Sequence, residues 1–211
     1  IDTSRLTNES VTLTPNGQFF RINKQGFLAE IMESMYNDRT VYKKKSIEAK
    51  KDLEKETDPV KRVEIEKRIA RYNNLQLAKK VSLNSAYGAL GNEYFRFFDV
   101  RQATAITTSG QLAIRWIEKK LNEYLNKICG TENFDYAFYS DTDSCYITLD
   151  PLVKKFYANK SKSEIVDILD KICKEKLTDV INQACMNLAD YTNAFEPKVF
   201  FKREAIADSG I

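Results

Sequence analysis

Two long helical patterns separated by one break constrain the fold of this chain more than any other feature. From Gly26 to about Glu56, apolar residues recur every three or four positions, and Lys, Glu and Ala are frequent. Thr57-Asp58-Pro59 interrupts this pattern, and a second helical pattern runs from Pro59 to about Leu83. Because the break is so short, the sequence predicts an antiparallel hairpin of two helices, each roughly 40 Å long.

The remainder of the chain mixes helical and strand patterns. Helices are predicted from about Val100 to Cys129, where Gly130 suits the end, and over about Ser163 to Tyr191. The aromatic cluster Tyr94-Phe95-Arg96-Phe97-Phe98 is interpreted as core, with a base-stacking platform as the alternative. Strands are predicted at three places, Phe134–Tyr139, Cys145–Leu149 and Lys198–Lys202. The predicted fold class is therefore α+β.

Two aspartates stand one residue apart in Tyr139-Ser140-Asp141-Thr142-Asp143-Ser144, between the first two predicted strands. In an extended chain, side chains two residues apart share a face, so both carboxylates could reach one ion. Oxygen ligands of this kind suit Mg²⁺, which binds proteins through one or two carboxylates together with substrate phosphates. The pattern predicts a magnesium site at the tip of a β-hairpin. A purely structural turn is the alternative, because Asp is a common turn residue.

A calcium-binding loop also begins with Asp-x-Asp, but it needs glycine at its sixth position and Glu at its twelfth. Tyr146 stands at the sixth position and no Glu stands at the twelfth, which excludes this kind of loop.

Composition excludes several classes of chemistry. The chain has no histidine, which removes Ser-His and Cys-His nucleophile systems and the commonest transition-metal ligand. Its seven glycines form neither of the common phosphate-binding loops, so phosphate would have to be bound by side-chain cations. No apolar run is long enough to predict a membrane span, and an intracellular protein is expected. The four cysteines lack paired metal-ligand spacing and are expected to be buried thiols: Cys129, Cys145, Cys173 and Cys185.

The predicted helical hairpin carries an excess of positive charge. The stretch from Arg39 to Lys80 contains 14 Lys+Arg and 7 Asp+Glu, whereas the whole chain has a net charge of only +3. Lys43 lies four residues after Arg39 on the same helix face, and Lys80, Asn84 and Tyr87 form one stripe on the second helix. If the stripes converge, three cations could bind a triphosphate. A solvated face with mixed ion pairs is the alternative, above all in the outer half of the hairpin.

Two motifs resemble those of family B DNA polymerases. Lys80-Val81-Ser82-Leu83-Asn84-Ser85-Ala86-Tyr87-Gly88 is similar to their Lys-x-x-x-Asn-Ser-x-Tyr-Gly motif. Tyr139 to Ser144 is similar to their Tyr-Gly-Asp-Thr-Asp-Ser motif, with Ser140 in place of glycine. Residues 89–92, 99–108 and 202–206 further resemble the replicative polymerases of T-even-like bacteriophages. The resemblance covers nearly the whole chain.

This resemblance implies the fingers and most of the palm of a DNA-directed DNA polymerase. Residues 1–25 would connect palm and fingers, residues 26–88 would be the helical hairpin of the fingers, and residues 89–211 would be a partial palm with a small antiparallel sheet. The implied partners are primer-template DNA, a dNTP and the remaining polymerase segments, without a membrane. The implied location is the cytoplasm of an infected bacterial host.

The resemblance also implies roles for individual residues. Asp143 would be the principal metal ligand in the palm and Asp141 a supporting carboxylate, with Glu204 as a further candidate and two Mg²⁺ ions in the complete enzyme. Lys80 would bind the incoming dNTP and donate a proton to departing pyrophosphate. The other residues implied at the nucleotide are Arg39, Lys43, Asn84 and Tyr87.

One expected part of the resemblance is missing. Nothing before Gly26 resembles the first palm motif, an Asp followed by a Ser-Leu-Tyr-Pro-like stretch, and the chain begins at Ile1 rather than methionine. These features predict a piece of a longer or split polymerase that cannot polymerise DNA without the first palm motif, exonuclease and thumb. The alternatives are a non-catalytic nucleic-acid-binding or assembly subunit and a purely structural helical hairpin, which would leave the acidic tip and the Lys80 stripe unexplained.

Overall fold

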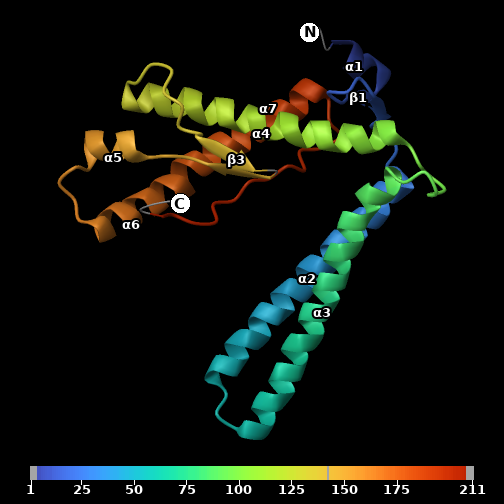
Figure 1. Cartoon of the computed structure of the whole chain (residues 1–211), viewed down its shortest axis with the longest axis horizontal. Coiled ribbons are helices and arrows are strands. Elements are labelled where there is room, and N and C mark those ends of the chain that lie inside the picture. Colours follow the sequence, from blue (N-terminus) through green and yellow to red (C-terminus); the bar gives the residue numbers. More distant parts are fainter. Residues whose placement is uncertain (1–3, 142, 208–211) are drawn as a thin grey trace. The chain divides into compact units, whose positions relative to one another are not determined.

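The chain folds into an α+β structure, as the sequence predicts. The computed structural model describes residues 4–141 and 143–207 (Figure 1). They divide into two compact units: one is Lys24–Thr104, and the other combines the chain before Lys24 with the chain after Thr104. The division falls within the first turns of helix α4 (Val100–Cys129). None of the described helices combines the length and the apolar character that a membrane span needs.

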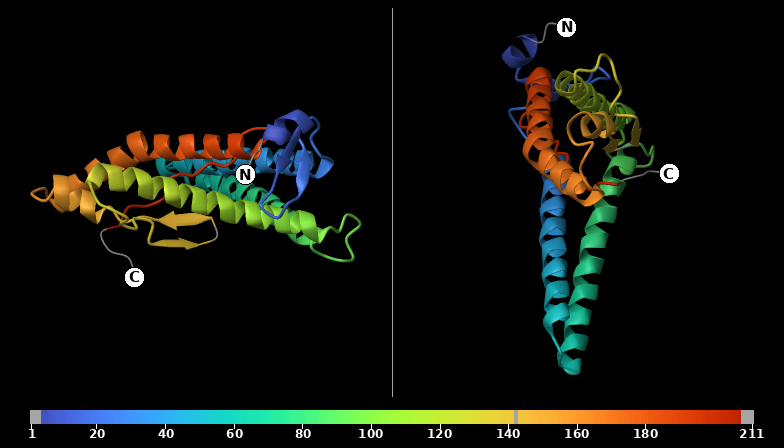
Figure 2. Two further views of the ribbon diagram at one scale, coloured as in Figure 1. Left: turned by 90° about the horizontal axis from the view of Figure 1, so that it is seen from above. Right: turned by 90° about the vertical axis from the view of Figure 1, so that its left-hand side faces the viewer.

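The unit Lys24–Thr104 is a hairpin of two long helices, α2 (Phe27–Lys55) and α3 (Pro59–Leu90), which lie side by side (Figures 1 and 2). The bounds predicted for α2 are confirmed to within a residue. Helix α3 continues past its predicted end at Leu83 and runs through Gly88 to Leu90. A glycine inside a helix costs about 1 kcal/mol relative to alanine. Burial of the Leu90 side chain offsets that cost, so the helix ends only at Gly91.

Hydrogen bonds close the connection between α2 and α3. The Asp58 carboxylate caps α3 by accepting a hydrogen bond from the Val60 N–H at 2.9 Å. The Arg62 guanidinium donates to the carbonyl oxygens of Leu53 at 2.9 Å and Glu56 at 2.7 Å, which lie at the end of α2. These contacts satisfy backbone groups that a helix end leaves unpaired, and they hold the reversal of the chain at the predicted break.

The two helices pack along a seam with a seven-residue repeat. Inward positions alternate in steps of four and three, which is the spacing of coiled-coil packing. On α2 the buried or half-buried positions of the seam are Leu28, Met32, Met35, Arg39, Tyr42, Ser46, Ala49 and Leu53. On α3 they are Arg62, Ile65, Ile69, Tyr72, Gln76, Lys79, Leu83, Ala86 and Leu90. In the middle of the seam, the Ser46 hydroxyl donates to Asn73 Oδ1 at 2.7 Å.

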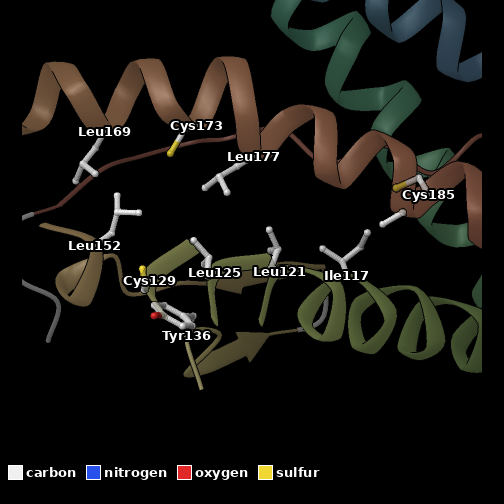
Figure 3. Packing of buried hydrophobic residues seen from close by; sticks show 11 residues of the cluster. Ile117, Leu121, Leu125, Cys129, Tyr136, Leu152, Leu169, Cys173, Leu177 and Cys185 are labelled. Atoms are coloured by element: carbon white, nitrogen blue, oxygen red, sulfur yellow. The ribbon is translucent and has the colours of Figure 1, made fainter. Parts of the chain in front are cut away.

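The other unit has its core between α4 and a long helical rod (Figure 3). The rod consists of α6 (Lys162–Ile172), the π-helical turn η1 (Cys173–Leu177) and α7 (Thr178–Thr192). The wider turn of η1 keeps residues four apart, such as Cys173 and Leu177, on the face toward α4. The buried residues from α4 are Ile117, Leu121, Leu125 and Cys129, and those from the rod are Leu169, Cys173, Leu177, Ala184 and Cys185. Tyr136 and Leu152, the latter from α5 (Asp150–Phe156), complete the cluster.

The prediction of buried thiols is confirmed for three cysteines. Cys129, Cys173 and Cys185 are buried, whereas Cys145 is half-buried, and all four are free thiols. The interpretation of the aromatic cluster 94–98 as core is wrong: Tyr94 is 89% exposed, and Phe97 and Phe98 are also exposed. The Phe97 ring packs edge-on against the Phe95 ring, and its centroid lies 4.9 Å from the centroid of the Phe27 ring. The cluster therefore forms local ring contacts on the surface.

The strand predictions are only partly correct. The hairpin consists of β3 (Tyr139–Asp141) and β4 (Ser144–Tyr146), which is shorter than predicted. Residues 134–138 are not a strand, because the backbone N–H groups of Phe134, Tyr136 and Ala137 donate to side chains of α4 instead of a neighbouring strand. The predicted strand Lys198–Lys202 is wrong, since this segment is irregular and pairs with no described strand.

A second small sheet, not predicted, lies near the start of the chain. After α1 (Ser4–Glu9), strands β1 (Val11–Leu13) and β2 (Phe19–Arg21) pair antiparallel. Two side chains join this sheet to the end of α7. The Thr12 hydroxyl donates to the Thr192 carbonyl at 2.7 Å, and Asn193 Nδ2 donates to the Val11 carbonyl at 2.8 Å.

Substitutions of Asn193 should separate its two structural roles. Asn193 ends α7 with a φ of 52°, in the left-handed region that glycine tolerates and alanine does not. We expect Asn193→Gly to lower the free energy of unfolding by about 1 kcal/mol through the lost hydrogen bond. Asn193→Ala should cost about 1–2 kcal/mol more, because it adds backbone strain. Urea unfolding measures both, and equal losses in the two variants would contradict a role for the left-handed conformation.

Candidate functional site

The predicted acidic tip is an exposed turn between β3 and β4. The strands pair Tyr139 with Tyr146, Ser140 with Cys145 and Asp141 with Ser144, and Asp143 lies in the turn before Ser144. Thr142 lies outside the described residues. The Asp143 N–H donates to the Asp141 carbonyl, and the Ser144 hydroxyl donates to the same carbonyl at 3.2 Å. Asp141 ends a strand whereas Asp143 lies in a turn, so the extended geometry that the sequence argument assumed does not hold at Asp143, and both residues are exposed at the end of the hairpin.

The two faces of the hairpin differ. One face carries the Tyr139 and Tyr146 rings, whose centroids are 5.4 Å apart and which are both more than half exposed. Asp141 shares this face with Tyr139, since it lies two residues along the same strand. The other face carries Cys145, which is half-buried. The hairpin thus presents Asp141 with the exposed tyrosines and turns its cysteine inward.

The environment of Cys145 gives a prediction about its reactivity. Burial raises the pKa of this thiol to about 11, and the negative charges of Glu118 and Asp135 act in the same direction. A raised pKa keeps the thiol protonated to higher pH. Alkylation by iodoacetamide at pH 8 should therefore be about 100-fold slower than for a solvent-exposed thiol with an ordinary pKa. The rate should continue to rise with pH beyond pH 10. Peptide mass spectrometry of the labelled chain measures the rate, and a midpoint near pH 8.5 would contradict this environment.

Glu204 is not gathered with the two aspartates into a metal-binding group. No three Asp, Glu, Cys or His side chains come together in this way anywhere in residues 4–141 and 143–207. Glu204 is exposed and lies in an irregular segment that is anchored on both sides. Phe201 and Ile206 pack against the core, and the Arg203 guanidinium forms an ion pair with Asp170 on α6. A metal-binding role for Glu204 therefore stays a prediction.

Arg39 lies in the seam of the helical hairpin, which the sequence argument did not anticipate. Its Nε is buried and has no hydrogen-bond partner among the described residues. The ion pair between Asp38 and Lys79, at 2.7 Å, puts Arg39 and Lys80 at the same level of the two antiparallel helices. A signal was present in the sequence, because Arg39 occupies a position of the seven-residue repeat that is otherwise mainly apolar on α2.

The hairpin has one flank with ion pairs, and on its other flank no ion pair between the helices is formed among the described residues. Asp38–Lys79 and Asp52–Arg68 bridge the helices along the first flank. At about 100° per residue, Lys43 on α2 and Lys80 on α3 project from the opposite flank. Both lysines are exposed, and neither has an ion-pair partner within the described part of the chain.

Asn84 and Tyr87 continue the flank of Lys80 and are also exposed. The hairpin thus brings the Lys43 and Lys80 stripes to one flank. The acidic turn belongs to the other unit of the chain.

Comparisons with known proteins bear directly on these motifs. Residues 2–185 match the model of DNA polymerase family B. The chain is 45% identical over 134 residues to the DNA-directed DNA polymerase of Escherichia phage RB69. This alignment covers 63% of the chain and 15% of the phage protein. It is 42% identical over 144 residues to the DNA-directed DNA polymerase of Enterobacteria phage T4, or 67% of this chain and 16% of that protein.

A more distant relative is DNA polymerase beta of African swine fever virus, which is 32% identical over 117 residues. This match covers 54% of the chain and 9% of the viral protein. The chain therefore aligns with only about a sixth of the length of its phage relatives. The family match over residues 2–185 includes both the helical hairpin and the acidic turn. With a family match over residues 2–185, the chain belongs to DNA polymerase family B.

Proposed function

We propose that this chain contributes the nucleotide-binding fingers and one acidic corner of the active site of a DNA-directed DNA polymerase. Residues 26–88 would form the fingers and residues 89–211 part of the palm, with residues 1–25 connecting them. Primer-template DNA and dNTP would be the substrates, and the cytoplasm of an infected bacterial host the place of action. The observation that carries the proposal is the exposed pair Asp141 and Asp143 at the tip of a hairpin, in a chain of this family.

The two aspartates fit a role in binding Mg²⁺. Both are exposed, and the Asp143 carboxylate has no ion-pair or hydrogen-bond partner among the described residues. Two carboxylates satisfy only part of the coordination of Mg²⁺, which accepts substrate phosphates and water at its other positions. When bound, two Mg²⁺ ions would activate the primer hydroxyl and stabilise the attacking and leaving oxygens. Asp143 would be the principal protein ligand of this chain, and Asp141 would support it; Glu204 would lie nearby.

The flank of the hairpin without ion pairs fits the triphosphate. Lys43 and Lys80 offer two compact positive charges that no described carboxylate neutralises. The buried Nε of Arg39 has no partner among the described residues, and Arg39 would bind a phosphate oxygen by moving its side chain out of the seam. Asn84 would line the nucleotide pocket and Tyr87 would pack near the nascent base pair. Lys80, being exposed, could also donate a proton to departing pyrophosphate.

Polymerase activity would require segments beyond these 211 residues. No stretch of the 211-residue sequence resembles the first palm motif. The described residues also contain no group of three acidic, Cys or His side chains that could bind metal. A further carboxylate, the exonuclease and the thumb would come from elsewhere, in the same polypeptide or in another. We therefore expect the 211-residue chain to show no primer extension by itself.

A chimeric polymerase tests the proposal. The segment of the phage RB69 polymerase that aligns with this chain would be replaced by the corresponding residues of the chain, and Mg²⁺-dependent extension of a primer-template would be measured. We expect extension by the chimera and none by the 211-residue chain alone. A folded chimera that binds primer-template but does not extend it would favour a non-catalytic nucleic-acid-binding or assembly subunit.

A further inference from the structure

Two asparagines of α4 hold the segment that leads into the acidic hairpin. Asn122 and Asn126 lie one helical turn apart and point their amides at residues 131–137. Asn122 Oδ1 accepts hydrogen bonds from two successive backbone N–H groups, those of Tyr136 at 2.9 Å and Ala137 at 3.1 Å. One side-chain oxygen thus fixes the backbone two residues before β3 begins.

The Asn126 amide fixes the same segment further upstream. Its Oδ1 accepts from the Phe134 N–H at 3.0 Å and from the Thr131 hydroxyl at 2.8 Å. Its Nδ2 donates to the Phe134 carbonyl at 2.8 Å and to the Asn122 carbonyl at 2.9 Å. Both the donor and the acceptor of this amide are therefore used, and Asn126 is linked to Asn122 along the helix.

Tyr136 is the fixed point at the root of the hairpin. Its side chain is fully buried in the core, and its hydroxyl bonds to the Thr131 hydroxyl at 2.8 Å. Its carbonyl oxygen accepts a hydrogen bond from the Thr148 N–H at 2.8 Å. Thr148 lies just after β4. Asn122 therefore acts on both arms of the hairpin: directly on the arm that enters β3, and through Tyr136 on the arm that leaves β4.

The described residues of the acidic turn are more exposed than this root. Asp141 and Asp143 are exposed, and the tyrosines of their face are more than half exposed. A two-stranded hairpin without a third strand is only marginally stable in water. Its position relative to α4 therefore depends strongly on its root, where the core and the two asparagine amides hold it, in addition to the inward side chain of Cys145.

We propose that Asn122 is a positioning residue for the metal-binding aspartates: by holding the backbone of Tyr136 and Ala137 against α4, it sets where Asp141 and Asp143 stand. The inference rests on the proposed function of the two aspartates. Metal sites depend on such outer contacts, whose loss commonly reduces metal affinity or activity about 10- to 100-fold. The side-chain contacts of Asn122 are with Asp135, Tyr136 and Ala137, so it would act on the aspartates through the hairpin.

Two substitutions of Asn122 test whether its side-chain oxygen, as the acceptor of both backbone N–H groups, is what holds the hairpin. Asn122→Leu is close in size but removes the acceptor of both N–H groups. Asn122→Asp is made in an Asp135→Asn background, because otherwise two carboxylates would meet where Asn122 Nδ2 now contacts Asp135 at 2.9 Å. In that background it keeps the acceptor, and residue 135 supplies the donor of this contact. Asn187→Leu is the matched control, because this asparagine lies on α7 and its one side-chain hydrogen bond among the described residues is accepted from the exposed side chain of Gln183 at 2.9 Å.

The first measurement is amide hydrogen exchange on the 211-residue chain, without metal or substrate. We expect Asn122→Leu to speed exchange at three hairpin amides with a bonded N–H group, those of Tyr136, Ala137 and Thr148, by at least about 10-fold relative to the unaltered chain. Exchange at the core amides of Leu121 and Leu177 should stay unchanged. Asn122→Asp and Asn187→Leu should leave the hairpin amides protected. Unchanged hairpin exchange in Asn122→Leu would overturn the proposal.

The second measurement is primer extension by the chimera over a range of Mg²⁺ concentrations. We expect Asn122→Leu to raise the half-maximal Mg²⁺ concentration and to lower kcat about 10-fold or more, while KM for dNTP stays within about twofold. Asn122→Asp should keep most of the activity. If Asn122→Leu does not fold, the Asp variant decides: loss of activity with protected hairpin amides would overturn the proposal. Failure of the unaltered chimera to extend would refute the proposed function instead, and the exchange result would be unaffected.

Discussion

Replacing Asp143 with asparagine is expected to reduce Mg²⁺-dependent primer extension by the chimera at least about 1,000-fold. Asparagine preserves the size of the side chain and one oxygen, but it removes the negative charge that binds a divalent cation. The effect should fall on kcat, because the metal acts on the reacting oxygens in the transition state. The stability of the fold should change little, since Asp143 is exposed and its carboxylate has no partner among the described residues.

A matched control for Asp143→Asn is Asp150→Asn. Asp150 is also an exposed aspartate of the same unit, and its carboxylate forms a surface ion pair with Lys154 at 3.3 Å. Such pairs contribute little to stability, so removing this charge should leave extension within about twofold. Equal losses from both substitutions would show that the effect is one of net charge. An Asp143→Asn chimera that keeps its activity would refute metal binding by this turn.

Lys80→Ala is expected to lower kcat/KM for dNTP about 100-fold. An exposed lysine without a described ion-pair partner is free to make charge-assisted hydrogen bonds with a triphosphate, each worth about 1.5–3 kcal/mol. KM for dNTP should rise because a phosphate contact is lost, and kcat should fall if Lys80 also protonates pyrophosphate. Lys80→Arg should recover part of KM, since arginine keeps the charge, but little of kcat, since its pKa is too high for proton transfer.

The neighbouring lysine is the control for Lys80. Lys79 lies in the seam and pairs with Asp38 at 2.7 Å, an interaction that raises the pKa of its ammonium group through the hydrogen bond to that carboxylate. Lys79→Ala should therefore weaken the packing of the hairpin but leave kcat/KM for dNTP within about threefold. Single-nucleotide incorporation kinetics measure both variants. If Lys79→Ala reduced nucleotide use as much as Lys80→Ala, a specific role for the flank without ion pairs would be excluded.

The sequence by itself determined the features that depend on local order along the chain. The helical hairpin followed from apolar residues at three- and four-residue spacing on both sides of the Thr57-Asp58-Pro59 break, and the observed α2 and α3 agree with it. Helix α4 was predicted from Val100 to Cys129 and has those bounds. Periodicity and caps are written in neighbouring residues, so they can be recognised without a partner. The two motifs that resemble family B polymerases are equally local.

Other features depended on contacts between distant parts of the chain. Residues 134–138 read as a strand, but Asn122 and Asn126 take their backbone N–H groups, and a strand cannot form without them. Lys198–Lys202 reads as a strand as well, yet no described strand pairs with it. Alternation shows that a segment could pair, whereas pairing itself depends on which donors and acceptors the tertiary fold brings alongside.

In the candidate site, too, some features follow from the sequence and others from the tertiary structure. The sequence determined which residues carry the charge: Asp141, Asp143, Arg39, Lys43 and Lys80. Only the tertiary structure decided that Lys43 and Lys80 share the flank without ion pairs, while Arg39 lies in the seam with a buried Nε. The reason is that helix periodicity fixes angles within one helix, but the face that a helix turns toward its neighbour follows from packing two surfaces together.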